Sequence, residues 1–289
     1  MRRQGRRLGQ YAMLMRLDRP VSSLLLLWPV LAALWIAGDA HPRGRVFVVF
    51  VLGALVMHAA GSVINDFADR DVDPAVRRTR GRPLAARHVG PLEALALSAL
   101  LLAVALWLVM HLDTLTVRMS VVGAALAVSA PFLKRFFPLP QFHLAIAFSW
   151  GVPMAFAAQT GTVPRVAWLL FFAGILWAAA WGTIHAMVDR EDDLRIGVKS
   201  SAILFADMDR FLIAVMQLAA LFALLLVGRT MRFGHWYDFG LIAAAALFAW
   251  QQWLIRRREP EACLRAYGSN HYVGLAIFAG LVLEYSLHS

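Results

Sequence analysis

Long apolar runs recur along the whole chain, and they constrain the fold more than any other feature. Each run has 17 residues or more, which is enough for a helix to cross a hydrocarbon core of about 30 Å. Of the 289 residues, 60% are hydrophobic and 16% are charged, whereas about 25% charged residues are usual in a soluble domain. The sequence therefore predicts an all-α, polytopic membrane protein, with residues 1–289 forming a single integral-membrane domain.

The apolar runs predict nine membrane spans, whose ends are defined to about 2–4 residues. The spans are residues 21–37, 46–64, 91–111, 117–133, 142–158, 165–187, 211–228, 237–255 and 271–287. Acidic clusters follow the second and the sixth span, four spans apart, so we expect a bundle of two similar four-helix halves plus a ninth helix. The first apolar run follows several arginines near the N-terminus, as the apolar part of a signal peptide does. The run is long for a signal peptide and contains Trp28, Pro29 and Trp35, so we interpret it as a retained helix.

The basic residues predict how the chain is oriented in the membrane. Of the 28 Lys and Arg residues, 22 lie in the N-terminal segment and in the loops after even-numbered spans, and six lie in the other loops. Positive residues stay on the cytoplasmic side. We therefore expect an integral protein of a bacterial inner membrane, with the N-terminus and both acidic clusters in the cytoplasm.

Charge and cysteine content exclude several classes of protein. The net charge of +10 is explained by topology and by attraction to anionic membrane lipid. No aromatic–basic module is present, so we expect no nucleic-acid partner. Cys263 is the single cysteine, which excludes an internal disulfide, a CxxC zinc site and a CxxCH haem site.

Eight of the 18 acidic residues fall in two short clusters at the ends of apolar segments. Carboxylates beside a membrane are costly and usually functional. Within each cluster the spacing places the acidic side chains on one helix face. The side chains on these faces are Asp66, Asp69 and Asp73 in the first cluster, with Asn65 at the margin of the face, and Asp189, Asp192 and Asp193 in the second. Each cluster alone is also typical of a solvated charged loop, but two on one side, within otherwise basic loops, favour a shared site.

Facing carboxylates repel each other unless cations lie between them, and oxygen ligands favour Mg²⁺ together with substrate phosphate. Basic groups near the clusters are suited to hold diphosphate oxygens. They are Arg70, Arg77, Arg78, Arg82, Lys134, Arg135, Arg190 and Lys199. Among them we expect Arg70, Arg78 and Lys199 to bind the diphosphate. The rest of the site would be apolar helix faces. We therefore expect a site that holds a diphosphate at the cytoplasmic rim and a long hydrocarbon chain within the bundle. An allylic diphosphate bound there would ionise to a carbocation-like centre, which an electron-rich aromatic ring could capture.

The chain resembles the UbiA superfamily of intramembrane prenyltransferases, and most closely the branch that prenylates 4-hydroxybenzoate in ubiquinone synthesis. The first family motif, NDxxDxxxD, is complete from Asn65 to Asp73, and the second, DxxxD, is formed by Asp189 and Asp193. Shorter stretches also match, including Leu24–Pro29 (LLLLWP), Pro131–Arg135 (PFLKR) and Tyr272–Leu275 (YVGL). The resemblance covers nearly the whole chain.

The resemblance implies a magnesium-dependent transfer of a long-chain polyprenyl group from polyprenyl diphosphate to 4-hydroxybenzoate, ortho to its hydroxyl. It implies that Mg²⁺ is bound by Asn65, Asp66, Asp69, Asp73, Asp189 and Asp193. Lys134 matches the diphosphate-contacting lysine of the family, Arg135 matches a basic residue close to the active site, and Arg16 resembles a further basic residue of the site. We expect Asp69, Asp189 and Arg135 to be catalytic.

Three residues depart from the pattern of the branch, which reads YPFxKR and YDTxYAMxDR. Ala130 and His185 replace tyrosines, and Gly182 replaces an aspartate. His185 lies one turn before Asp189, and either it helps to deprotonate the acceptor as a catalytic residue or it is a packed histidine at a helix end. The departures leave open a prenyltransferase of the same scaffold with a different acceptor. A cation transporter is a further alternative, although the basic residues suit phosphate better than cations.

Overall fold

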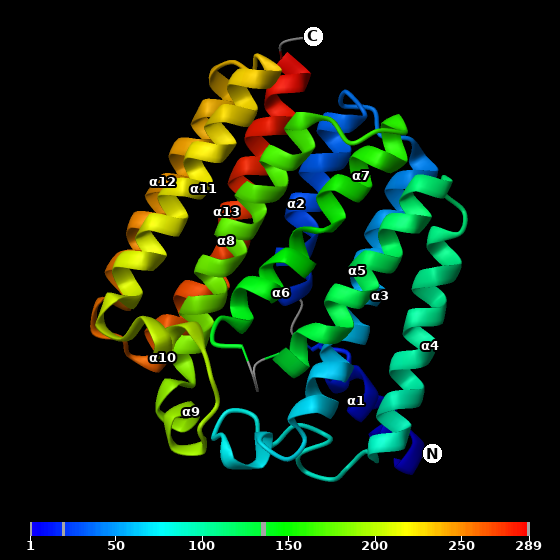
Figure 1. The fold of residues 1–289 in the computed structure, drawn as a ribbon, viewed down its shortest axis with the longest axis vertical. Helices are drawn as coiled ribbons and strands as arrows, with labels where there is room; N and C mark the ends of the chain where they lie inside the picture. Colours follow the sequence, from blue (N-terminus) through cyan, green and yellow to red (C-terminus); the bar gives the residue numbers. More distant parts are fainter. Residues whose placement is uncertain (1, 19–20, 134–136, 288–289) are drawn as a thin grey trace.

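The computed structural model describes residues 2–18, 21–133 and 137–287, and in these residues all regular secondary structure is helical. The helices run side by side in one bundle (Figure 1). Six segments of the described chain are long and apolar enough to cross a membrane. They are α3 (Gly44–Asp69), α4 (Pro91–Val109), α5 (Thr114–Leu133), α8 (Arg165–Val188), Ser201–Met231 with α10 (Ser201–Phe205) and α11 (Asp209–Met231), and His235–Arg257 with α12 (His235–Leu254).

The prediction of an all-helical membrane protein is confirmed, whereas the count of nine spans stays a prediction. The remaining apolar runs form α2 (Val21–Ala37), α13 (Pro260–Leu287) and two helices of ten residues, α6 (Pro140–Ser149) and α7 (Gly151–Thr160). The run predicted at 142–158 is thus broken at Trp150. Pro153 has no amide hydrogen and cannot continue the hydrogen-bond ladder of α6 into α7.

The core lies around α8, which is the most buried of the six membrane-length segments. One cluster of buried apolar residues extends from Leu25 in α2 to Leu281 in α13. Small residues let the last two helices approach closely: a Cβ atom added at Gly280 would lie 2.9 Å from the Cα atom of Gly240. Such contacts between small residues are a common means of helix association in membranes.

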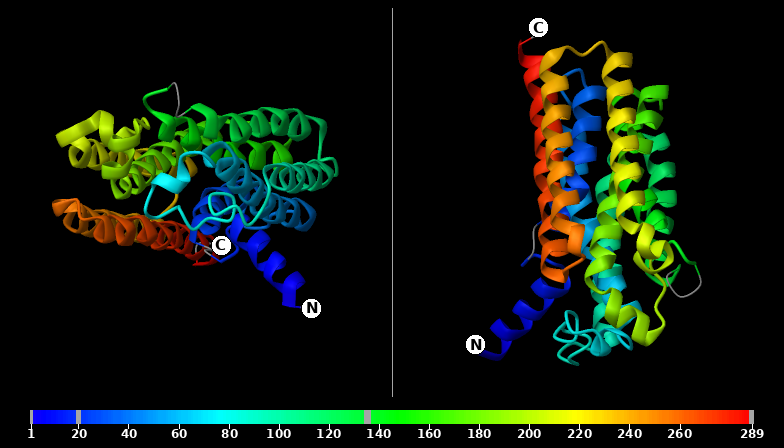
Figure 2. Two further views of the ribbon diagram at one scale, coloured as in Figure 1. Left: turned by 90° about the horizontal axis from the view of Figure 1, so that it is seen from below. Right: turned by 90° about the vertical axis from the view of Figure 1, so that its left-hand side faces the viewer.

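Both acidic clusters lie at the same end of the bundle, which we call the acidic end. There α3 and α8 end, and the α3–α4 loop (residues 70–90) and α9 (Arg190–Ile196) extend beyond them (Figure 1). Helix α1 (Arg2–Leu14) leaves the bundle at this end, and α13 ends at the opposite end (Figure 2). Three short 3₁₀ turns complete the fold: η1 (Asp73–Ala75), η2 (Ala206–Met208) and η3 (Ile255–Arg257).

Candidate active site

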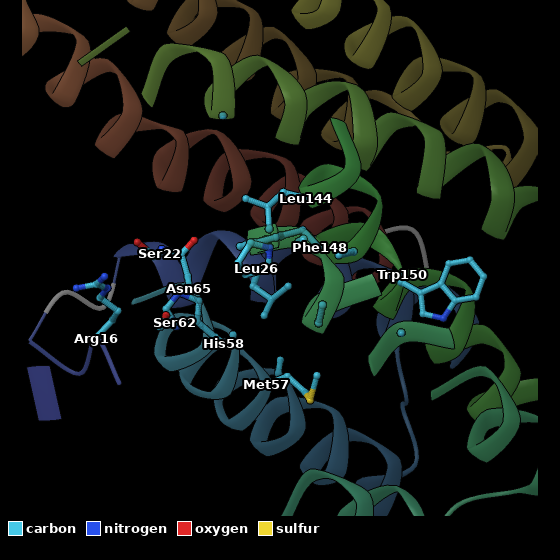
Figure 3. Close-up of a pocket in the computed structure, with 18 of the residues that line it drawn as sticks. Arg16, Ser22, Leu26, Met57, His58, Ser62, Asn65, Leu144, Phe148 and Trp150 are labelled. Carbon is cyan, nitrogen blue, oxygen red and sulfur yellow. The ribbon is translucent and has the colours of Figure 1, made fainter. Parts of the chain in front are cut away.

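A cavity of about 750 Å³ opens inside the bundle and reaches the acidic end. Figure 3 shows Arg16, Ser22 and Asn65 at one end of it, with Met57 and Trp150 further along. The walls formed by α4 and α5 are largely apolar, with Leu106 and Val121 among their residues. The cavity thus has a charged end and an apolar body.

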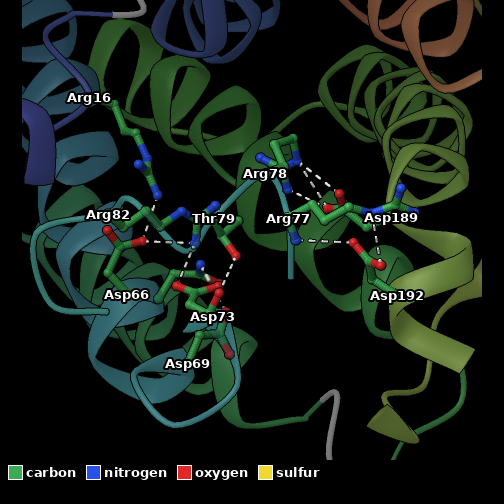
Figure 4. Close-up of polar contacts among 11 residues, drawn as sticks. Arg16, Asp66, Asp69, Asp73, Arg77, Arg78, Thr79, Arg82, Asp189 and Asp192 are labelled. Atoms are coloured by element: carbon green, nitrogen blue, oxygen red, sulfur yellow. Dashed lines mark hydrogen bonds and ion pairs between the residues drawn. The ribbon is translucent and has the colours of Figure 1, made fainter. Parts of the chain in front are cut away.

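The first acidic cluster is held by arginines that come from two other segments (Figure 4). Asp66 is fully buried, and its carboxylate accepts from Arg16 at 2.5 Å and from Arg82 at 3.1 Å. The same Arg82 nitrogen donates to Asp73 at 2.9 Å. Arg16 adopts a left-handed backbone conformation (φ 59°), which is unusual for a residue with a side chain and is found where the surroundings enforce it.

Asn65, Asp69 and Asp73 line the cavity, whereas Asp66 does not. Asn65 donates to Asp69 at 3.2 Å, and the hydroxyl of Thr79 donates to the main-chain oxygen of Asp73 at 3.0 Å. Burial raises the pKa of Asp73; Arg82 opposes this shift, and the neighbouring carboxylates of Asp69 and Asp66 add to it. A cation bound beside this cluster would relieve that repulsion.

The second cluster begins at Asp189, which lies between α8 and α9 as the C-cap of the first and the N-cap of the second. Its carboxylate accepts from Nε of Arg78 at 2.9 and 3.1 Å and from Nη2 of the same guanidinium. Burial disfavours the charged form, but the hydrogen bonds and charge of Arg78 prevail and hold the pKa of Asp189 below its usual value. Asp189, Asp193 and Arg78 line the cavity.

Three of the six residues predicted to bind the diphosphate line the cavity, namely Arg16, Arg78 and Lys199. Arg70 does not: its guanidinium lies over the ring of Phe67, 4.6 Å from the centroid, and contacts Asp71 at 3.5 Å. Lys134 and Arg135, predicted as diphosphate and catalytic residues, lie outside the described residues.

An aromatic wall lies next to the second cluster. His185 is packed against Tyr267 with ring centroids 4.5 Å apart, and Trp181 packs edge-on against both Tyr267 and Phe148. All four residues line the cavity, and Nδ1 of His185 has no hydrogen-bond partner within the part of the chain that the structure describes. Nδ1 of His185 is thus a buried nitrogen without a protein partner among the described residues.

Two polar residues of the cavity were missed by sequence reasoning. His58 lies within α3 and contacts Ser23 at 3.1 Å, and Tyr267 of α13 contacts Ser22 at 3.0 Å. An ionisable residue inside an apolar run is a signal that would have found His58. No spacing rule connects Tyr267 to the acidic motifs, because it comes from a helix 78 residues after Asp189.

The three departures from the family pattern share one location. Ala130, Gly182 and His185 all line the cavity. At Gly182 a Cβ atom would meet the side chain of Gln141 at 3.5 Å, which is ordinary van der Waals contact. The departures thus change the shape and the polarity of the cavity wall.

The oxygen donors of the cavity are suited to Mg²⁺ bound together with a phosphate group. Among the described residues no three His, Cys, Asp or Glu side chains are gathered closely enough to hold a metal ion by themselves. Arginine side chains lie between the carboxylates instead (Figure 4). Magnesium usually takes only one or two protein carboxylates and completes its shell with water and substrate phosphate, and this donor set satisfies that requirement.

Comparison with known proteins places this architecture in a family. The profile described as the UbiA prenyltransferase family matches residues 26–278. The chain is 51% identical over 277 residues to the 4-hydroxybenzoate octaprenyltransferase of Aeromonas salmonicida, covering 96% of each chain. It is 53% identical over 281 residues to the protein of that name from Alkalilimnicola ehrlichii, covering 97% of this chain and 96% of the relative.

Solved structures share the fold. The apo structure of a UbiA homologue from Aeropyrum pernix K1 superposes with a TM-score of 0.79 at 22% identity, covering 92% of this chain and 98% of that one. A UbiA homologue from Archaeoglobus fulgidus bound to GPP and Mg²⁺ gives a TM-score of 0.73 at 17% identity, covering 94% of this chain and 99% of that one. With the sequence matches, these show that the chain belongs to the UbiA prenyltransferase family.

Proposed function

We propose that this protein is a 4-hydroxybenzoate polyprenyltransferase of ubiquinone synthesis. It transfers a long-chain polyprenyl group from polyprenyl diphosphate to the ring carbon ortho to the hydroxyl. The observation that carries the proposal is a single cavity that joins two facing acidic motifs to an apolar body. The relatives named 4-hydroxybenzoate octaprenyltransferase, about half identical over nearly the full chain, support the acceptor.

Asn65, Asp69 and Asp73 would hold Mg²⁺ from one side, and Asp189 and Asp193 from the other. When bound, the metal neutralises the diphosphate and assists its departure. The homologue solved with GPP and Mg²⁺ supports this assignment by fold. Asp66 lies behind the cavity and accepts from Arg16 and Arg82, so we assign it to the placement of these arginines.

Arg16, Arg78, Arg82 and Lys199 would bind the diphosphate oxygens, because all four line the charged end of the cavity. Their hydrogen bonds strengthen as the C1–O bond breaks and negative charge gathers on the leaving group. The isoprenoid tail would lie along the apolar walls of α4 and α5. Lys134 and Arg135 keep the roles that the resemblance implies.

The acceptor ring would lie at the aromatic wall, where the ring nitrogen of His185 has no partner among the described residues. We assign His185 as a hydrogen-bond partner or base for the acceptor hydroxyl.

We further propose that the protein lies in a bacterial inner membrane with its acidic end facing the cytoplasm. The excess of Lys and Arg predicted for that side supports this orientation. We also propose nine membrane spans, one of which α6 and α7 form together, arranged as two similar four-helix halves plus a ninth helix. These spans would belong to a single domain, which the continuous buried cluster from Leu25 to Leu281 supports.

The test is prenyl transfer to 4-hydroxybenzoate in membranes that carry the protein, with polyprenyl diphosphate as donor. We expect a prenylated product that requires Mg²⁺ and disappears with EDTA. Asp69→Ala and Asp189→Ala should each lower the rate by about 10²-fold or more, since each removes a ligand of the leaving group's counter-ion. Full activity in either variant would refute its assignment.

A panel of other aromatic acids in the same assay tests the acceptor. Preferred use of 4-hydroxybenzoate supports the proposal despite Ala130, Gly182 and His185. Preference for another acceptor, with Mg²⁺ dependence intact, would keep the prenyltransferase and replace its acceptor.

A further inference from the structure

Two segments that are distant in sequence form the wall of the cavity at the acidic end. The α3–α4 loop contributes Asp73, Val76 and Thr79, and the segment around α9 contributes Asp193 and Lys199. Both segments thus line the charged end of the cavity, and a change in their relative position would change how much water can enter it.

One set of contacts joins these two segments outside the cavity. The main-chain amide of Arg77 donates to Asp192 at 3.1 Å, and its Nε donates to the other oxygen of Asp192 at 3.3 Å. A terminal nitrogen of Arg77 donates to Glu191 at 3.0 Å. Neither Arg77 nor Asp192 lines the cavity. Asp192 is only 8% exposed, although charged groups are seldom buried without a partner.

This contact differs from its neighbour inside the cavity. Arg78 and Asp189 also pair across the same two segments, but both face the cavity, so diphosphate and cation compete for them. Arg77 and Asp192 have no such competitor, and their contact can persist when substrate is bound. Asp192 also fixes the main chain beside Arg78 through the amide of Arg77.

We propose that the Arg77–Asp192 contact is a latch that holds the α3–α4 loop and α9 together during catalysis and keeps water from the allylic cation. The inference rests on the proposed function. Without the latch, after the C1–O bond to diphosphate breaks, a water oxygen forms the new bond to C1 and releases a proton. The products are then polyprenol and diphosphate, in place of prenylated acceptor.

The experiment measures how the consumed polyprenyl diphosphate divides between polyprenol and prenylated 4-hydroxybenzoate, with Mg²⁺ present. The variants are Arg77→Gln and Asp192→Ala in the full chain in membranes. Arg195→Gln is the matched control, because Arg195 lies 3.8 Å from the same carboxylate but within α9 itself, so it joins no second segment.

We expect the polyprenol fraction to rise at least about threefold in Arg77→Gln and Asp192→Ala, a modest effect because the Arg77 side chain is largely solvated. Arg195→Gln should match the wild type. Asp192→Asn keeps an acceptor for the amide of Arg77, so its polyprenol fraction should be lower than that of Asp192→Ala.

Lower total turnover with an unchanged polyprenol fraction would overturn the latch, since a merely structural role moves the rate and not the partition. If Asp192→Ala does not accumulate, the exposed Arg77→Gln variant decides the matter alone. If the wild type prenylates nothing, the proposed function is refuted. If the wild type prenylates the acceptor and the Arg77→Gln and Asp192→Ala variants release no more polyprenol than it does, only the latch is refuted.

Discussion

Asp66 and Asp69 lie one turn apart in α3, yet their surroundings separate their roles. Asp66 is fully buried beneath Arg16 and Arg82, while Asp69 lines the cavity. Removing one partner of a buried ion pair leaves the other charge uncompensated. We therefore expect Asp66 to contribute to the stability of the acidic end and Asp69 to contribute to the site.

We expect Asp66→Asn to lower the free energy of unfolding by about 3 kcal/mol, because two largely buried guanidinium groups lose their carboxylate. Asp69→Asn should cost less stability and raise the Mg²⁺ concentration needed for half-maximal activity. Thermal unfolding in detergent and Mg²⁺ titration of the activity measure the two effects. Wild-type stability with a raised Mg²⁺ requirement in Asp66→Asn would instead make Asp66 a metal ligand, as the resemblance implies.

The sequence predicted which residues carry the charge at the acidic end, but not which of them line the cavity. Helical spacing predicts Asp66, Asp69 and Asp73 on one face of a helix, but α3 ends at Asp69 and Asp73 begins the 3₁₀ turn η1, so the prediction of one shared helix face is wrong for Asp73. Spacing alone also does not tell which of the three side chains meets the cavity. That choice depends on Arg16, which approaches from the turn before α2, and on Arg82 from the loop. Arg70 shows the same limit, because its neighbour Phe67 holds it outside the cavity.

At the scale of helices, the apolar runs predicted where helices lie in the sequence better than they predicted whether each helix is continuous. Helix α2 spans the predicted 21–37, whereas the run at 142–158 is broken into α6 and α7. Hydropathy cannot detect this break, because both halves are apolar. Gly151 and Pro153 carried the signal, since glycine and proline interrupt helices.

Helix α13 caps the start of α12 through a buried carboxylate. Glu284 is 3% exposed and accepts from the amides of Gly234 at 2.6 Å and Tyr237 at 3.3 Å. These are amides at the start of α12, which have no carbonyl partner within the helix. A side chain 50 residues away in sequence thus satisfies them, and no local capping rule predicts it.

We expect Glu284→Ala to lower the free energy of unfolding by about 1–3 kcal/mol, since buried amides lose their acceptor. Glu284→Gln keeps an acceptor oxygen and should lose less. Thermal unfolding in detergent compares them. Because Glu284 lies at the end opposite the acidic clusters, prenyl transfer at permissive temperature should stay near wild type; a selective loss of activity would contradict a purely capping role.

On the scale of the whole molecule, ion pairs join the two parts of the chain that carry the acidic motifs. Arg77 and Arg78 of the α3–α4 loop pair with Asp192 and Asp189. Hydropathy and charge bias predicted that both motifs lie at one end, but not these pairings, because they depend on how the loop folds back across the bundle. The arginines supply the positive charge that the facing carboxylates require.

Magnesium and diphosphate should therefore stabilise the folded protein together more than either does alone. Mg²⁺ by itself competes with arginines for the carboxylates, and diphosphate by itself competes with carboxylates for the arginines, whereas the two together satisfy both sets. A ligand present at 100 times its dissociation constant adds about 2.7 kcal/mol to the stability of the folded state. We expect the midpoint of thermal unfolding in detergent to rise clearly when inorganic diphosphate and Mg²⁺ are both present. Either one alone, or the pair in the presence of EDTA, should raise the midpoint only a little. Asp69→Ala should lose the joint effect, and an equal rise with Mg²⁺ alone would show that the carboxylates bind the cation without a phosphate partner.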